Sequence, residues 1–392
     1  MHDDKVHYLN GLRGLLAISV FLHHFSYAFY PDLVFGGSYD DFLAGKWTLC
    51  RIIAYSPLNL LSNTGMSINF FFLLSGYVQS YHYFKKNEAG FIRRSFIKRY
   101  FRLAIPTLVV VLLVFVFHRL SLIDKDHFPT HPLSDPWIKT MLPDNMNFLE
   151  VLNYALVNCF NGAHDYYQVL WTMPSELYNS WMVLILLLVT HRIRNRSFVF
   201  ILWILAQIFL LQSFYGVSFS LGMFVCMLHQ RAAKFNGFFS RPFLKGICLV
   251  LGLYFASYPN TGYETSAQRS MYNPISFFDV YPHVISYIFG NLLLFLLLLH
   301  SPALKKLLSK RILLFFGRIS FMFYLIHFLL LFSFSPWLYQ KLGMTLVNTA
   351  TLWLTAFISF MLITGVSYLL YKWVDQPVIK LCDRSVKRVF GL

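Results

Sequence analysis

The sequence contains few charged side chains for its length. Charged residues make up 13% of its 392 residues, whereas 57% are hydrophobic and 19% are aromatic. Soluble globular domains carry roughly 25% charged residues, and a soluble chain of this size could not bury so much apolar surface. The composition therefore excludes an ordinary soluble protein and predicts that lipid surrounds much of the chain.

Cysteine is scarce as well, and its pattern excludes two common kinds of site. The five cysteines are scattered and lack Cys-x-x-Cys spacing: Cys50, Cys159, Cys226, Cys248 and Cys382. They indicate neither a zinc site nor a disulfide framework. His127 and His131 have a spacing that metal ligands use, but their proline-interrupted stretch is typical of a solvated loop. We therefore expect no metal ion.

Acidic residues number only 17 against 33 lysines and arginines, a formal net charge of +16. Such an excess could indicate nucleic-acid binding, but its distribution favours membrane topology. Long apolar runs, separated by short polar or basic segments, predict about ten transmembrane helices. The predicted spans are Leu12–Tyr30, Leu61–Phe84, Leu103–Leu120, Trp171–Thr190, Phe198–Tyr215, Val217–His229, Leu244–Ala256, Tyr281–Leu299, Ile312–Phe332 and Val347–Tyr371.

The basic residues predict how these spans are oriented. If the N-terminus is cytoplasmic, 25 lysines and arginines lie on the cytoplasmic side and seven on the opposite side, with Arg13 inside the first span. This positive-inside bias predicts that both termini are cytoplasmic. The first apolar run has no cleavage site after it, so we expect a signal anchor. The prediction is one all-α membrane domain over residues 1–392, with its largest non-cytoplasmic loop at about 121–170.

The first span carries two ionisable residues, Arg13 and His24. An arginine at the centre of a span costs about 2.5–3.5 kcal/mol, so such residues usually serve a function. At about 100° per residue, eleven residues make roughly 20° more than three turns, which puts Arg13 and His24 on one helical face about 16 Å apart. His23 lies on a different face. The alternative is that Arg13 extends to the inner surface and His24 caps a carbonyl group.

Two further segments are open to a structural or a functional interpretation. Ser75 and Gly76 in the second span are small residues that allow close helix packing, and the residues alone favour that interpretation. Segment 93–102 carries more basic residues than topology requires, and it suits a phosphate-rich ligand and anionic lipid headgroups equally well. Its basic residues are Arg93, Arg94, Lys98, Arg99 and Arg102.

The start of the fourth span contains Trp171, Pro174 and Glu176. Pro174 fits a first helical turn, and Glu176 complements the helix dipole there. The functional alternative is a carboxylate on the same side of the membrane as His24, able to orient the imidazole or to hold a hydroxyl group.

Taken together, these segments resemble the membrane acyltransferase family 3, whose members are multi-spanning O-acyltransferases. The matching motifs are Asn10-Gly-Leu-Arg13-Gly with His24, Phe71-x-x-x-Ser75-Gly76, Arg99-x-x-Arg102 before Pro106, Trp171-Thr to Glu176, Gly317-Arg-Ile-Ser320 to Tyr324-Leu-Ile-His327, and Asp375-Gln-Pro377. The chain departs from the family pattern where Phe321 replaces a tyrosine, Pro174 interrupts the Trp-to-Glu stretch and Asp375 replaces a glutamate.

The resemblance implies transfer of an acyl group, most often acetyl, from acyl-CoA to a hydroxyl group. It implies a catalytic role for His24 and Glu176, donor binding by Arg13, Ser75, Arg99 and Arg102, and acceptor binding by Trp171 and His327. Imidazole is suited to proton transfer near neutral pH, so His24 could be the general base for the acceptor hydroxyl or a nucleophile that forms an acyl-imidazole.

We therefore predict a membrane O-acyltransferase with acetyl-CoA as its expected donor and a small-molecule, glycan or lipid acceptor. It is expected in the endoplasmic reticulum or plasma membrane, with no nucleic-acid partner. The rival interpretation is a proton-coupled transporter, which more typically shows internal repeats or several carboxylates within its spans. In this chain the carboxylates lie at the ends of the predicted spans.

Overall fold

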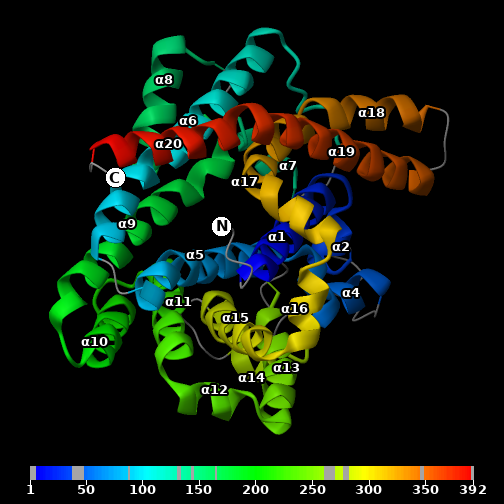
Figure 1. Cartoon of the computed structure of the whole chain (residues 1–392). Helices are drawn as coiled ribbons and strands as arrows, with labels where there is room; N and C mark the ends of the chain where they lie inside the picture. The colour runs from blue at the N-terminus through cyan, green and yellow to red at the C-terminus, as the bar shows by residue number, and fades with distance from the viewer. Residues whose placement is uncertain are drawn as a thin grey trace. The chain divides into compact units, whose positions relative to one another are not determined.

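The computed structural model describes residues 6–37, 48–86, 89–129, 134–142, 145–163, 166–259, 270–276, 282–344 and 348–389. Every regular element within these residues is a helix, and they contain no strand (Figure 1). The prediction of an all-α fold is confirmed. His131 lies outside the described residues, whereas Nδ1 of His127 lies 2.8 Å from a carboxylate oxygen of Asp124.

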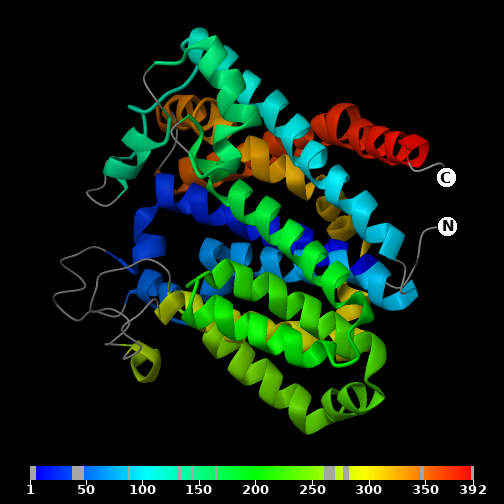
Figure 2. The ribbon, with the colours of Figure 1, turned by 90° about the vertical axis from the view of Figure 1, so that its left-hand side faces the viewer.

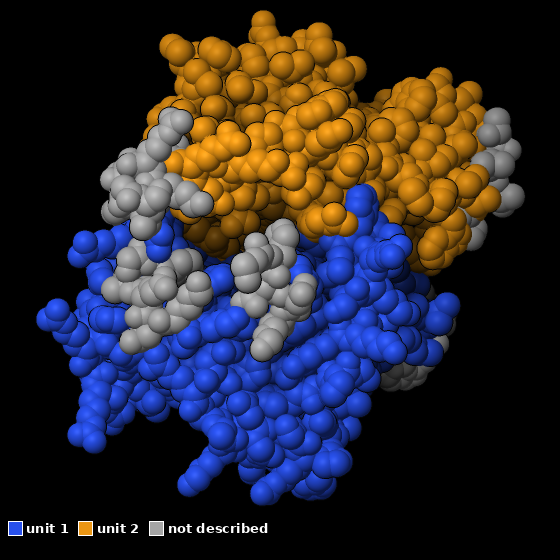
Figure 3. Space-filling model, viewed as in Figure 1, with its two compact units in different colours: residues 1–23, 32–96, 178–317 blue, residues 24–31, 97–177, 318–392 orange. Residues whose placement is uncertain are grey.

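The chain forms two compact units, coloured separately in Figure 3. Unit 1 comprises residues 1–23, 32–96 and 178–317, and unit 2 comprises residues 24–31, 97–177 and 318–392. Each unit is therefore assembled from three separate stretches of the sequence.

Unit 1 contains two pairs of long helices that pack along one another, α5 with α11 and α13 with α15 (Figure 2). Its elements are the first part of α1 (His7–Phe29), most of α2 (Pro31–Phe35), α4 (Leu49–Ala54), η2 (Pro57–Ser62), α5 (Thr64–Lys86), most of α9 (Met173–Val189), η5 (Thr190–Arg192), α10 (Arg196–Phe209), α11 (Phe214–Arg231), α12 (Ala233–Phe239), α13 (Pro242–Ala256), α14 (Asn273–Ser276), α15 (Pro282–His300), α16 (Pro302–Leu308) and the first turns of α17 (Arg311–Leu331).

The close packing of α5 against α11 depends on glycines from both helices. A Cβ atom on Gly76 would overlap the backbone carbonyl of Phe219, and one on Gly222 would overlap the backbone carbonyl of Leu73. Glycine is needed where two helix backbones approach this closely. The packing interpretation of the Ser75-Gly76 motif is thus confirmed for Gly76.

Unit 2 contains most of α6 (Ala89–Arg119), the longest α-helix among the described residues, and the C-terminal segment. Its elements are the rest of α1, most of α6 (Ala89–Arg119), α7 (Asp135–Thr140), α8 (Phe148–Leu156), η3 (Asn158–Phe160), η4 (Gln168–Thr172), the first turn of α9, most of α17, α18 (Phe334–Gly343), α19 (Asn348–Leu370), the π-helical turn η6 (Tyr371–Asp375) and α20 (Gln376–Val389). The described part of the predicted loop at 121–170 therefore contains α7, α8, η3 and the start of η4. Val151 and Tyr154 of α8 are buried, which is why this part of the segment is folded.

Six helical segments of the described chain are long and apolar enough to cross a membrane. They are His7–Phe29, Ile92–Arg119, Gln168–Arg192, His283–His300, Arg311–Leu331 and Ala350–Arg384. Helices α12 and α13 are bent by 72° at a short break and would make a seventh span if they are taken together. The prediction of a polytopic helical membrane protein is supported, and the count of ten spans and the cytoplasmic termini stay predictions.

Candidate active site

Two of the predicted site residues, His24 and His327, form a hydrogen-bonded pair in unit 2. Nδ1 of His24 lies 3.0 Å from Nε2 of His327. Nδ1 of His327 lies 2.7 Å from the backbone carbonyl oxygen of Tyr324, one turn earlier in α17. The side chain of His327 is completely buried. The structure thus places His327, predicted to bind the acceptor, directly against the predicted base.

The direction of the hydrogen bonds follows from the carbonyl group at one end of this pair. A carbonyl oxygen only accepts, so Nδ1 of His327 carries a hydrogen, and Nε2 of a neutral His327 is then an acceptor. Nδ1 of His24 donates to that nitrogen. When both rings are neutral, the remaining lone pair of His24 is therefore on Nε2, and this atom is the basic one.

Aromatic side chains surround the imidazole of His24. The ring of Trp137 in α7 is nearly parallel to it, with 6.1 Å between ring centroids. Phe328 meets it edge-on at 5.0 Å. Tyr27, one turn after His24 in α1, packs against Trp137 with 4.7 Å between centroids. These contacts hold the plane of the half-buried imidazole among aromatic rings.

Two tyrosines attach the segment that contains Trp171 to α17. The hydroxyl of Tyr324 donates to the carbonyl oxygen of Val169 at 2.7 Å, so it accepts from the hydroxyl of Thr172 at 3.0 Å. The hydroxyl of Tyr167 donates to the carbonyl oxygen of Leu325 and accepts from the N–H of Leu329. Both tyrosines therefore fix the turns of α17 that flank His327. Trp171 itself is half-buried in η4.

Glu176 forms an ion pair with Arg99 in unit 2. Pro174 and Glu176 fall in the first turn of α9, as their sequence predicts, and the carboxylate contacts a terminal guanidinium nitrogen of Arg99 from α6. The Nε atom of Arg99 is buried and has no hydrogen-bond partner among the described residues. Glu176, predicted to be catalytic, thus has as its partner Arg99, predicted to bind the donor.

Other acidic residues lie near the rest of the basic cluster in α6. Nζ of Lys98 is 2.6 Å from a carboxylate oxygen of Asp383 in α20. Arg102 is exposed and lies within electrostatic range of Asp375, which is buried in the π-helical turn η6. The protein itself therefore supplies counterions to part of the cluster, which lowers its excess positive charge.

Arg13 and Ser75, both predicted to bind the donor, belong to unit 1. Arg13 is half-buried between two glycines of α1 that approach other backbones: a Cβ atom on Gly11 would overlap the carbonyl of Leu308, and one on Gly14 would clash with the start of α17 at Gly317. These motif glycines allow α1 to pack closely. Ser75 is buried in α5.

The site also contains residues that the sequence did not indicate. Trp137 and Tyr167 both lie in the segment predicted as a loop, and Trp137 is distant in sequence from all of the motifs. The sequence signal that existed is weak: Trp137 follows Asp135-Pro136, a typical start of a short helix. Cys159 is close in sequence but is not a competing nucleophile, because burial raises the pKa of its thiol to about 12.

The family can now be tested against the whole chain. The acyltransferase family 3 model, described as an acyltransferase domain, matches residues 6–372. The chain belongs to this family. The family predicted from the motifs is therefore confirmed, and the protein is an acyl-transferring enzyme.

Curated relatives of this acyltransferase family 3 member are named acyltransferases. O-acetyltransferase PaAT-1 of Phomopsis amygdali is 24% identical over an alignment of 370 positions, gaps included, which covers 82% of this chain and 71% of the relative. Acyltransferase clz18 of Cochliobolus lunatus is 22% identical over an alignment of 453 positions, gaps included, which covers 96% of this chain and 94% of the relative. No solved structure matches the chain.

Proposed function

We propose that this acyltransferase moves an acetyl group from cytoplasmic acetyl-CoA to a hydroxyl group of a small-molecule, glycan or lipid acceptor, with His24 as the general base. The observation that carries the proposal is the hydrogen bond between His24 and His327, which leaves a basic nitrogen on His24. The similarity to an O-acetyltransferase supports both the acetyl group and the oxygen acceptor.

The proposed reaction is a direct transfer. Nε2 of His24 takes the proton of the acceptor hydroxyl while its oxygen attacks the thioester carbonyl carbon. The new C–O bond forms, the C–S bond breaks, and the coenzyme A thiolate takes the proton back from the imidazolium. His327 acts as a positioning residue, because its Nε2 accepts from Nδ1 of His24 and keeps that ring in the required tautomer.

The donor-binding proposal is supported by the geometry of Arg99. Glu176 holds one terminal nitrogen of this guanidinium group, and the buried Nε–H has no partner among the described residues, so it can donate to a phosphate oxygen of the donor. Arg102 is exposed on the next turn of α6 and adds a second cation. Arg13 and Ser75 keep their predicted donor-binding roles in this proposal.

The acceptor-binding proposal combines Trp171 with the aromatic residues around His24. Trp137 and Phe328 contact the imidazole and would form an apolar wall for the part of the acceptor next to its hydroxyl group. We further propose ten spans with both termini in the cytoplasm, which places the basic segments on the side where acyl-CoA is present.

The experiment is a thiol-release assay with purified full-length protein in lipid nanodiscs, acetyl-CoA and a panel of alcohols. His24→Ala should reduce acceptor-dependent release at least a hundredfold, a typical effect of losing a general base, with coenzyme A affinity nearly unchanged. The matched control is His23→Asn, whose amide can still donate to the carbonyl of Ser62 as His23 does. Full activity in His24→Ala, or an acetyl group trapped on His24 during turnover, would contradict the role as a base.

A further inference from the structure

The Asp375-Gln-Pro377 motif lies at a π-helical turn in unit 2. This turn, η6, joins α19 to α20 without a break in the helix. Such turns occur frequently at functional sites. Pro377 lacks an N–H group, and in a regular α-helix its ring would clash with the carbonyl group of Trp373, which lies within the turn. Pro377 therefore accounts for the irregular helix, whereas it does not explain why an acid precedes it.

Asp375 lies on the buried face of this helix. It is 4% exposed, whereas Lys372 and Trp373 of the same turn are exposed. The Oδ1 atom of Asp375 is buried and has no hydrogen-bond partner among the described residues, so this oxygen does not cap the start of α20. Burial of a carboxylate is unfavourable unless a cation is close. The acid therefore needs a basic side chain nearby.

Arg102 of α6 is the basic residue that interacts electrostatically with Asp375. Helices α6 and α20 are in contact close by, because Nζ of Lys98 lies 2.6 Å from a carboxylate oxygen of Asp383. Cys382, about two turns after Asp375, also lies within electrostatic range of Arg102. Several positions of α20 thus place its buried face next to the segment of α6 that contains Arg102.

Both arginines of the Arg99-x-x-Arg102 motif therefore have a carboxylate close by, Glu176 for Arg99 and Asp375 for Arg102. Arg102 is exposed, and a long side chain loses conformational freedom when it binds a ligand. A nearby carboxylate can restrict the side chain before the ligand arrives, which lowers the cost of binding. A guanidinium group has five N–H donors, so one edge can face a carboxylate while another faces a phosphate group.

We propose that Asp375 is a positioning residue for the acyl-CoA donor, and that its carboxylate orients Arg102 toward a phosphate group. The assignment rests on the proposed function, which makes Arg102 part of the donor site. The rival account treats Asp375 as a simple counterion that weakens the attraction of Arg102 for the phosphate. The two accounts differ in sign. Removal of the carboxylate weakens donor binding if Asp375 positions Arg102, and it strengthens donor binding if Asp375 only neutralises the charge.

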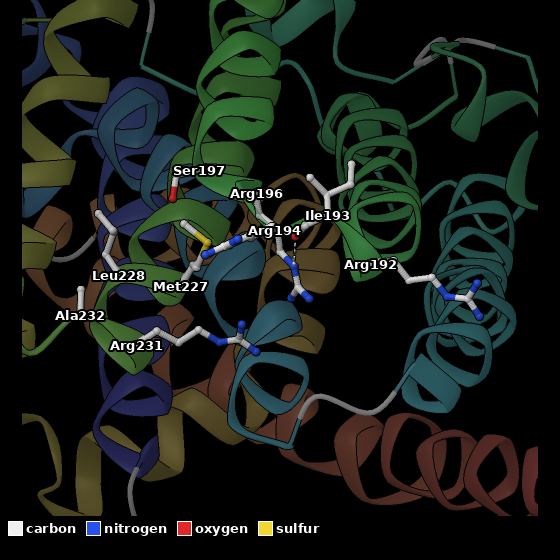
Figure 4. Close-up of a pocket in the computed structure, with 9 residues that line it drawn as sticks. All are labelled: Arg192, Ile193, Arg194, Arg196, Ser197, Met227, Leu228, Arg231 and Ala232. Carbon is white, nitrogen blue, oxygen red and sulfur yellow. Dashed lines mark hydrogen bonds between the residues drawn. The ribbon is translucent and has the colours of Figure 1, made fainter.

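The test is a double-mutant cycle on full-length protein in lipid nanodiscs, with coenzyme A affinity as the measurement. Asp375→Asn should weaken binding about three- to thirtyfold in wild-type protein, and it should have little effect when Arg102→Gln is already present. Asp375→Glu, which restores the residue of the family pattern, should keep most of the affinity. The control background is Arg194→Gln, because Arg194 lines a pocket of unit 1 (Figure 4). Asp375→Asn should have its full effect in that background.

An equal loss of affinity from Asp375→Asn in all three backgrounds would show that Asp375 acts on folding rather than through Arg102. Unchanged or tighter binding in Asp375→Asn would leave it as a counterion, and either result would overturn the proposal. Thermal unfolding checks that each variant is folded, and Asp375→Ser replaces Asp375→Asn in the cycle if the asparagine variant is not. Failure of wild-type protein to bind coenzyme A would refute the proposed function itself, whereas the results above refute only the role of Asp375.

Discussion

His23 and His24 are neighbours in α1, yet their side chains have different partners. Nδ1 of His23 lies 2.8 Å from the carbonyl oxygen of Ser62, an ordinary contact for a buried histidine. His24 instead pairs with a second imidazole whose other nitrogen is occupied. The two neighbouring histidines thus differ in the partner of Nδ1, a backbone carbonyl for His23 and a second imidazole for His24, the proposed base.

The partner of His24 can be tested at the level of single atoms. His327→Leu removes the acceptor for Nδ1 of His24, so the imidazole can take the wrong tautomer or turn, and kcat should fall about ten- to a hundredfold. His327→Gln can offer its amide oxygen to the same nitrogen and should restore part of the loss. Thiol-release kinetics measure both variants. Equal activities for the leucine and glutamine variants would show that His327 serves only to fill space.

The ion pair between Arg99 and Glu176 allows a second test, which separates folding from donor binding. Arg99→Met alone leaves Glu176 without its partner and should cost about 3 kcal/mol of stability. The double variant Arg99→Met with Glu176→Leu should recover that stability, measured by thermal unfolding. Coenzyme A affinity should stay about ten- to a hundredfold reduced in the double variant, because the guanidinium group that donates a hydrogen bond to the phosphate is still absent.

A recovery of both stability and affinity in this double variant would assign Arg99 to folding alone.

The sequence was sufficient to single out most of these residues but not their pairings. His24 was identified by its position in an apolar helix, where an ionisable group is unfavourable. Its bond to His327 joins residues on two different helices, α1 and α17, and no local periodicity predicts such a contact. Glu176 was expected to serve His24 or a hydroxyl group, whereas the structure pairs it with Arg99.

At the scale of helices, backbone contacts at glycines determine how α5 packs against α11. Gly76→Ala places a methyl group against the carbonyl of Phe219, and the helices must separate to accommodate it. We expect a loss of about 1–3 kcal/mol in stability and a lower thermal unfolding temperature. Gly246→Ala in α13 is the matched control, because open space surrounds that position. It should be neutral or stabilising by about 0.5 kcal/mol.

An unchanged unfolding temperature for Gly76→Ala would mean that α5 and α11 pack less closely than described. Ser75→Ala, one residue earlier, should leave stability nearly unchanged and weaken donor binding if Ser75 has its predicted role.

The long helices were easier to predict than the short helices in the segment at about 121–170. The long apolar runs gave α15 and α17 within one residue of their bounds, whereas α1 and α6 end where predicted but begin about five and fourteen residues earlier. Residues 121–170 were predicted as a loop because prolines and polar residues hide the short apolar patterns of α7 and α8. Burial of Ile138 stabilises α7, and burial of Val151 and Tyr154 stabilises α8, which only the tertiary structure shows.

At the scale of the whole molecule, the sequence predicts ten spans, whereas six described helical segments are long and apolar enough to cross a membrane. The burial of helices inside the protein explains this difference. Helix α5 has 23 residues, about 34 Å, which is sufficient to cross a bilayer. Its polar residues Ser67, Asn69 and Ser80 are buried in protein. A helix enclosed by other helices does not need to be apolar on every face.

Topology reporters would decide the number of crossings. Fusions after Lys86, Arg196 and Lys310 should report the cytoplasm, because the segments that end there hold most of the basic residues. Fusions within residues 124–143 should report the opposite side. A cytoplasmic signal from that segment would contradict the ten-span topology.

The boundaries between the two units have a consequence for dissecting the protein. The units change over between residues 23 and 24, 31 and 32, 96 and 97, 177 and 178, and 317 and 318, and each of these positions lies inside a helix. Expressing one unit by itself would therefore sever α1, α2, α6, α9 and α17. Each cut would create a new helix end with up to four N–H or C=O groups lacking their intrahelical partners, so neither unit of this enzyme can be obtained by trimming a linker.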